Sequence, residues 1–124
     1  MKMLLPFLFL ALSLAACGKP QAGDSCEANT GACESSNEAL FCESARLRSI
    51  DCNGPLGCSE STSGQVSCDF SRARAGDSCP ASNENTAQCY SGNPDQGLRC
   101  QGGVWTAAAC KGCAVQNNTV VCQP

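Results

Sequence analysis

The sequence predicts a small disulfide-rich fold: two tandem six-cysteine modules built from short antiparallel β-hairpins, with little helix. Three observations lead to this prediction. The 124 residues include 13 cysteines, a density typical of disulfide scaffolds. The segment Ala-Gly-Asp-Ser-Cys occurs at 22–26 and again at 75–79, so the second half of the chain repeats the first. Large apolar residues are too sparse to offset the chain entropy alone, so the modules need covalent cross-links.

The first 16 residues have the features of an export signal. Met1-Lys2-Met3 carries a positive charge, and the stretch from Leu4 to Ala11 is apolar apart from Pro6. Small residues follow, as a processing site requires. The apolar stretch is too short to span a bilayer. We therefore expect residues 1–16 to be a signal peptide that is removed from the mature chain.

Cys17 ends the run Leu14-Ala15-Ala16-Cys17 and is the odd cysteine, since the other 12 form an even set. This run resembles the lipobox of bacterial lipoproteins, whose signal peptidase cuts before a cysteine that already carries a diacylglyceryl group. The resemblance implies lipid attachment at Cys17, a tether over 17–21 and an anchor in a bacterial membrane. By the same resemblance, Gly18 in place of Asp after the cysteine implies the outer membrane, on its periplasmic face or at the cell surface. The alternative is a secretory signal followed by an ordinary disulfide cysteine.

The other 12 cysteines form two sets of six, which define the modules. We place the modules at 22–70 and 75–124, joined by a linker at 71–74, and we expect every disulfide to lie within one module. An exported chain reaches an oxidising compartment in which such bonds form. Asp24 and Asp77, in the repeated segment, are expected to bond nearby backbone N–H groups in Asx turns. The cysteines are Cys26, Cys33, Cys42, Cys52, Cys58 and Cys68, then Cys79, Cys89, Cys100, Cys110, Cys113 and Cys122.

Hairpins are expected where turn residues separate short β-prone segments. Gly102-Gly103 separates 98–101 from 104–106, and Asn117-Asn118 separates 114–116 from 119–121; both residue types tolerate the positive φ that such turns need. Counting outward from the second turn places Cys113 opposite Cys122. A three-residue loop at 62–64 places Cys58 opposite Cys68 in the same way. Because opposed side chains approach closely, we predict the disulfides Cys58–Cys68 and Cys113–Cys122.

The first four cysteines of each module are less constrained. Counting from Gly102-Gly103 places Cys100 opposite Trp105 and leaves Cys110 well beyond it, so these two cysteines are poor partners. Two pairings per module then stay open, because spacing alone does not choose between them. We favour Cys26–Cys42 with Cys33–Cys52, and Cys79–Cys100 with Cys89–Cys110.

The modules lack the usual residues of catalysis. The chain contains no histidine, so a Ser or Cys nucleophile has no usual base, and a zinc site would need four reduced thiolates. Cys110-Lys111-Gly112-Cys113 matches the Cys-x-x-Cys of thiol-disulfide oxidoreductases, but nothing around it indicates the helix N-terminus that lowers a thiol pKa. We expect a protein that is not an enzyme and has no cofactor or metal. A thiol-active protein that uses Cys110 and Cys113 is the third hypothesis for the function, after the two given below.

The charge balance and the aromatic residues limit the partners. The mature chain would have 7 basic against 11 acidic residues, and the basic ones are scattered, which argues against nucleic acid. Trp105, near Tyr90, could bind a sugar or a protein, but we favour a core position such as Leu47 would have in the first module. The leading hypothesis is a non-enzymatic, membrane-anchored lipoprotein that presents two rigid modules to an unidentified protein or glycan. The alternative is a protease-inhibitor-like module whose loop 53–57 enters an active site.

Replacing Cys17 with serine tests the anchor. Serine cannot form the thioether that links the diacylglyceryl group, and several acyl chains on one residue exceed the two signals that stable anchoring needs. We expect the variant to leave the membrane fraction, measured by cell fractionation and detergent phase partitioning. Partitioning that is the same for the wild type and the variant would contradict lipidation at Cys17.

Overall fold

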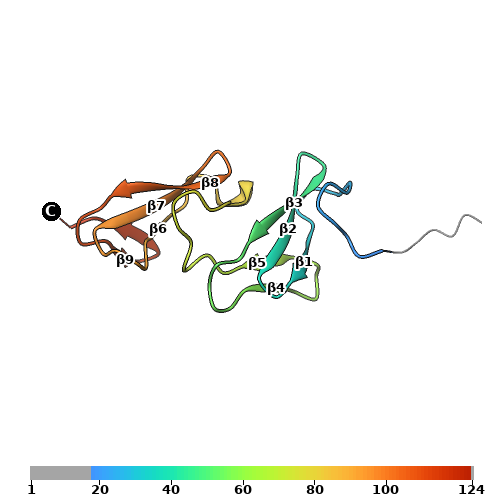
Figure 1. Cartoon of the computed structure of the whole chain (residues 1–124), viewed down its shortest axis with the longest axis horizontal. Coiled ribbons are helices and arrows are strands. Elements are labelled where there is room, and N and C mark those ends of the chain that lie inside the picture. The colour runs from blue at the N-terminus through green and yellow to red at the C-terminus, as the bar shows by residue number, and fades with distance from the viewer. Residues whose placement is uncertain (1–17, 124) are drawn as a thin grey trace, which may run out of the picture.

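The computed structural model describes residues 18–123 as short β-strands with a single turn of 3-10 helix, in two modules that lie end to end (Figure 1). Cys17 and the expected signal peptide lie outside the described residues. The predicted fold class is confirmed. The first module contains β1 (Gly31–Ser35), β2 (Glu38–Glu43), β3 (Arg46–Asp51), β4 (Cys58–Glu60) and β5 (Val66–Cys68). The second contains η1 (Ala81–Asn83), β6 (Ala87–Cys89), β7 (Gln96–Gln101), β8 (Val104–Ala109), β9 (Ala114–Gln116) and β10 (Thr119–Val121).

Each module combines a three-stranded antiparallel sheet with a two-stranded hairpin. The sheets have the orders β1-β2-β3 and β6-β7-β8, and the hairpins are β4–β5 and β9–β10. The two sheets share one register. Cys100 pairs with Trp105, as predicted, and Cys42 pairs with Leu47 in the same way. Gly102 and Gly103 have the expected positive φ, 59° and 83°. The repeat in sequence is therefore a repeat of pairing and turn geometry.

Six disulfides join the cysteines of the described residues in one pattern. In each module the first cysteine bonds the third, the second bonds the fifth, and the fourth bonds the sixth. The bonds are Cys26–Cys42, Cys33–Cys58, Cys52–Cys68, Cys79–Cys100, Cys89–Cys113 and Cys110–Cys122. The predicted bonds Cys26–Cys42 and Cys79–Cys100 are confirmed. The other four predicted bonds are wrong: Cys33–Cys52, Cys58–Cys68, Cys89–Cys110 and Cys113–Cys122.

The predicted register of the hairpins is correct although their predicted disulfides are wrong. Cys58 lies opposite Cys68, but Cys58 bonds Cys33 on β1, and Cys68 bonds Cys52, which follows β3. Strands of three residues do not form a stable hairpin alone. A Cys58–Cys68 bond would close the hairpin on itself, whereas the observed bonds attach it to the sheet. In the second module, Cys113 and Cys122 likewise bond outside their own hairpin.

Strand spacing explains why the other two predicted bonds do not form. Cys33 lies on β1 and Cys52 follows β3, with β2 between them. Neighbouring strands lie about 4.8 Å apart, so these cysteines are separated by at least about 9–10 Å, beyond the span of a disulfide. The same separation applies to Cys89 and Cys110, because β7 lies between β6 and β8.

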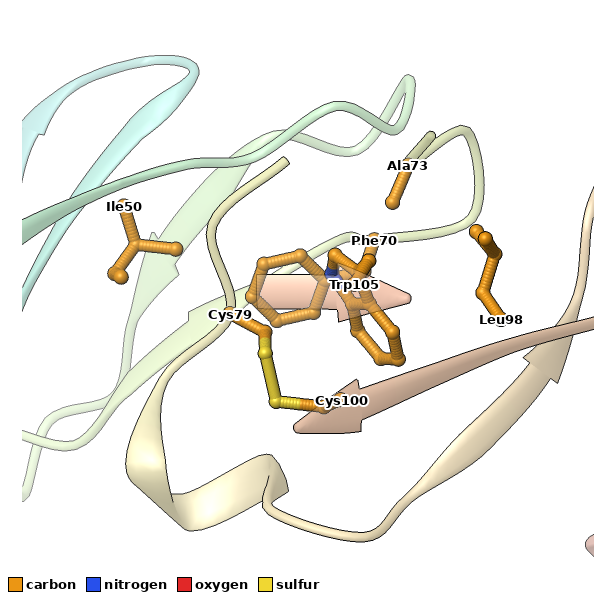
Figure 2. Packing of buried hydrophobic residues seen from close by; sticks show 7 residues of the cluster. All are labelled: Ile50, Phe70, Ala73, Cys79, Leu98, Cys100 and Trp105. Atoms are coloured by element: carbon orange, nitrogen blue, oxygen red, sulfur yellow. A yellow bond between two sulfur atoms is a disulfide. The ribbon is translucent and has the colours of Figure 1, made fainter. Parts of the chain in front are cut away.

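The buried apolar cluster lies where the two modules meet (Figure 2). Trp105 is 2% exposed, and the centroid of its indole lies 5.7 Å from that of the Phe70 ring, tilted by 59°. Figure 2 shows the two rings beside the Cys79–Cys100 disulfide. Phe70 ends the first module, whereas Trp105 lies on β8 of the second. The members of the cluster are Ile50, Phe70, Ala73, Cys79, Leu98, Cys100 and Trp105.

A polar network reinforces this junction. The Arg48 guanidinium on β3 donates to two carbonyls of the second module, Cys79 O at 3.1 Å and Gly103 O at 2.8 Å. Glu43 holds the same guanidinium at 3.2 Å and accepts a hydrogen bond from the Ala81 N–H at 2.7 Å. Two strands of the first module therefore contact three backbone groups of the second. These contacts join the modules into one unit.

Replacing Arg48 with alanine should weaken the junction. The carbonyls of Cys79 and Gly103 lose their donor and Glu43 loses its cation, so we expect the free energy of unfolding to fall by about 1–3 kcal/mol. Urea denaturation followed by Trp105 fluorescence measures the change at the junction itself. The matched control is Arg46→Ala, because Arg46 is exposed and donates to Gly23 O within its own module. Equal losses in the two variants would contradict a special role for Arg48.

Candidate functional site

Trp105 and Tyr90, the predicted candidates for binding, do not offer an open aromatic face. Trp105 is buried, so its predicted core position is confirmed and its candidacy as a binding residue is wrong. Its indole Nε1 is buried without a hydrogen-bond partner among the described residues. Tyr90 is half-buried against the junction cluster, and its ring covers Gly92, where an added Cβ would lie 2.7 Å from the ring. Scarce apolar residues are thus used for packing.

The Cys110-Lys111-Gly112-Cys113 segment does not form a redox pair in this structure. Cys110 bonds Cys122, and Cys113 bonds Cys89. A Cys-x-x-Cys catalyst cycles between a dithiol and a disulfide formed by its own two cysteines. The observed bonds use these cysteines to attach β9 and β10 to the rest of the module, which gives no support to thiol chemistry.

Within residues 18–123, no group of three or more His, Cys, Asp or Glu side chains is arranged to hold a metal ion. None of the helical segments in that range has the length and apolar character needed to cross a membrane.

The repeated Gly-Asp-Ser-Cys segments have a structural role. The Asp77 carboxylate accepts a hydrogen bond from the Arg74 N–H at 2.7 Å, and Asp24 accepts one from the Gln21 N–H at 2.9 Å. The expected bonds to nearby N–H groups are therefore present, although they run three residues backward, where an Asx turn runs forward. Gly76 takes a φ of +94° between the two ends of its turn. Each carboxylate thus closes the entry to its module.

Among residues 18–123, the most exposed large apolar side chain is that of Leu56, at 84%. It lies in the turn 53–57, which we call the Leu56 turn. The Gly57 N–H donates to Gly54 O at 3.1 Å, so the turn is closed by its own backbone hydrogen bond. Cys52 and Cys58 flank the turn, and both are in disulfides. An apolar side chain in water is therefore held on a backbone with little freedom.

Asp69 braces the Leu56 turn through its carboxylate and its backbone. Its carboxylate accepts hydrogen bonds from the Leu56 N–H at 3.0 Å and the Ser71 N–H at 3.0 Å. Its backbone bonds the turn twice, through Gly54 N to Asp69 O at 2.7 Å and Asp69 N to Gly57 O at 2.9 Å. A Cβ on Gly54 would collide with the carboxylate, so a larger residue there would displace the Asp69 side chain. The bond from Leu56 and then the bond from Ser71 hold the pKa of Asp69 below its ordinary value, while burial opposes them.

A shallow hollow of about 380 Å³ also lies at the junction of the modules. Phe41, Val66 and Pro80 contribute apolar walls, and Glu43 contributes a carboxylate. That carboxylate is already bonded to Arg48 and to the Ala81 N–H. The Glu43 carboxylate is therefore already paired and is not available to a ligand in the hollow. The hollow is a weaker candidate than the Leu56 turn.

Comparisons of the chain with protein-family models, with curated proteins and with solved structures found no match. The sequence located the Leu56 turn, through its Gly-Pro-Leu-Gly segment between two cysteines. It did not identify Asp69 as the brace, because Asp69 follows the hairpin and lies 13 residues from Leu56. An aspartate next to the last cysteine of the first module, with no counterpart at Gln123, is the signal that could have indicated it.

The lowered pKa of Asp69 makes the stability of the first module depend on pH. A carboxyl with a folded-state pKa below its unfolded value stabilises the fold above the unfolded pKa, and this stabilisation is lost as the pH falls through the folded pKa. Asp69→Asn should therefore be less stable than the wild type at neutral pH, and the difference should shrink below about pH 4. Urea denaturation of both proteins at neutral pH and below about pH 4 measures this difference in the free energy of unfolding. Asp51→Asn, an exposed control, should change little, and a loss in Asp69→Asn that is independent of pH would contradict this role.

Proposed function

We propose that this protein is a non-enzymatic lipoprotein, anchored to a bacterial membrane through Cys17, that presents a rigid two-module unit to a protein partner. The observation that carries the proposal is the exposed Leu56 on its braced turn. Affinity at protein interfaces is concentrated in a few residues. Burying the Leu56 side chain would contribute the free energy of removing a large apolar group from water, and an anchor that is rigid before binding avoids the entropy of ordering. Trp105 and Tyr90 are both used for packing, so a protein fits the described surface better than a glycan.

The short tether supports a function close to the membrane. Gln21 and Gly23 are already bonded within the first module, Gly23 to Leu47 O at 2.7 Å. Only residues 18–20 separate these contacts from Cys17. An extended chain spans at most about 3.3–3.6 Å per residue, so the first module would lie within roughly 15 Å of the lipid. A partner of the Leu56 turn would then be a protein at the membrane surface.

A protease-inhibitor-like module is the second candidate, favoured by the disulfides on both sides of the Leu56 turn. Such a module would insert Leu56 into a protease active site. Protease clefts bind their substrates as extended chains, whereas this turn is closed by the hydrogen bond from Gly57 to Gly54. The turn would have to open before it could enter, and Asp69 opposes that opening. The inhibitor therefore ranks below an interaction with a protein surface.

Photo-cross-linking in intact cells tests the proposed function. A photoreactive amino acid at position 56 of the full chain should give discrete adducts with a protein, because Leu56 would be buried in the complex. The same amino acid at Ser63, an exposed position in the β4–β5 turn, is the matched control and should give few. Leu56→Ala should then weaken binding of that protein by at least about 2 kcal/mol without changing the stability of the fold. The same adducts at both positions, or none at either, would contradict the proposal.

A panel of serine, cysteine and metalloproteases separates the second candidate. Under our proposal the protein inhibits none of them, and Leu56→Arg creates no inhibition of trypsin-like enzymes. Tight inhibition that is lost in Leu56→Ala would instead favour the inhibitor.

A further inference from the structure

Three of the four edges of the two main sheets are covered or charged. The edge of β1 faces the β4–β5 hairpin, where the Glu60 carboxylate accepts the Cys33 N–H and Cys33 bonds Cys58. The edge of β6 is attached to the β9–β10 hairpin through Cys89–Cys113. The edge strand β3 carries Arg46, Arg48 and Asp51. These are the devices by which natural proteins prevent association through strand edges.

Beyond Trp105, the edge of β8 has none of these devices. Its sequence is Val-Trp-Thr-Ala-Ala-Ala, without a charge or a proline, and its pairing with β7 contains no bulge. Residues 106–109 are all exposed. At the corresponding positions β3 has Arg48, Ser49, Ile50 and Asp51. The second module therefore has an open edge where the first has a charged one.

The backbone of β8 shows which groups are free. Trp105 N donates to Asp77 O and Trp105 O accepts from Gly76 N, both at 2.8 Å, so the polar groups of Trp105 point away from β7. Successive residues alternate in an antiparallel pair, so the N–H and C=O groups of Ala107 and Ala109 also point outward. Neither alanine has a hydrogen-bond partner on that side among the described residues. Four main-chain groups are thus available to an incoming strand.

We propose that this edge binds the same edge of a second copy of the chain, antiparallel and about a two-fold axis at Ala108. In that register Ala107 of each copy lies opposite Ala109 of the other, and all four free groups on each edge find partners. The two sheets become one continuous sheet of six strands. A two-fold pairing of this kind is self-complementary and closed, so it yields a dimer and no longer polymer.

Side-chain size and the backbone pattern favour a second copy over an unrelated strand. Alanine faces alanine at the central pair and at both outer pairs, so no bulky side chain opposes the approach. The pairing is also self-complementary, because each edge supplies the same donors and acceptors that the other edge leaves free.

The pairing is short, so the dimer depends on a high local concentration of the chain. Three residues on each side bury much less than the roughly 1,200 Å² of a stable complex, so the dimer should be weak in dilute solution. Confinement of the chains to one membrane surface would raise their effective concentration. That last step rests on the proposed lipid anchor, whereas the strand pairing itself does not.

Amide hydrogen exchange provides an internal control within one strand. The experiment uses the full chain in detergent, with the protein concentration raised about a hundredfold. Exchange at Ala107 and Ala109 should slow several-fold with concentration. Exchange at Thr106 and Ala108 should not change, because their N–H groups already bond β7. Slowing at all four positions alike, or at none, would overturn the proposal.

A charge swap at Ala108 distinguishes a second copy from any other strand. Ala108→Lys and Ala108→Glu each place like charges across the axis, so each variant alone should lose the concentration-dependent protection, and an equimolar mixture should recover it. Ser63→Lys, with the same change of charge far from the edge, should behave as the wild type. The variants keep the lipid, so shared micelles affect all of them equally, and Trp105 fluorescence confirms that each is folded. Protection that survives in Ala108→Lys, or a mixture that stays monomeric, would overturn the two-fold pairing; neither result bears on binding at Leu56.

Discussion

The architecture depends on the covalent attachment of a weak hairpin to a small sheet. In each module the second–fifth and fourth–sixth disulfides connect a hairpin of three-residue strands to both outer parts of a three-stranded sheet. Neither part buries enough apolar surface to be stable alone. Each bond removes on the order of 3 kcal/mol of chain entropy from the unfolded state, which is comparable with the whole stability of so small a module. The same bonds hold Cys52 and Cys58 in place, and so position the Leu56 turn between them.

The repeat is regular in backbone and different in side chains. The first-module residues at the junction are replaced at the matching positions of the second module. Arg99 stands at the position of Phe41, Gln101 at that of Glu43, Thr106 at that of Arg48, and Ala108 at that of Ile50. The second module therefore lacks the side chains through which the first module contacts its neighbour. The junction also explains why Trp105 stands at the position of Leu47, because Trp105 packs against the Phe70 ring.

The sequence was sufficient for features that depend on local geometry. Turn residues at 102–103 and 117–118 determine the register, and the register places Trp105 opposite Cys100. The disulfides were harder, because opposition across a hairpin makes Cys58–Cys68 plausible, and only the position of the third strand shows that Cys33 is nearer to Cys58 than to Cys52. The brace at Asp69 and the open edge of β8 were not predictable for a related reason. Both depend on which separate segments cover one another, and spacing along the chain does not contain that information.

The two proposed contacts lie on different modules, and their locations follow from the scarcity of apolar residues. Trp105, Phe70 and Ile50 are used at the junction, so little remains for an extensive apolar binding surface. A single leucine on a covalently braced turn provides an anchor at small cost in folding, since its exposure affects only one side chain. A strand edge provides a second contact without any apolar side chain, because main-chain groups supply the hydrogen bonds. The proposed contacts, a rigid turn on one module and an open backbone edge on the other, are therefore compatible with so small a core, and the Arg48 hydrogen bonds join the modules that carry them.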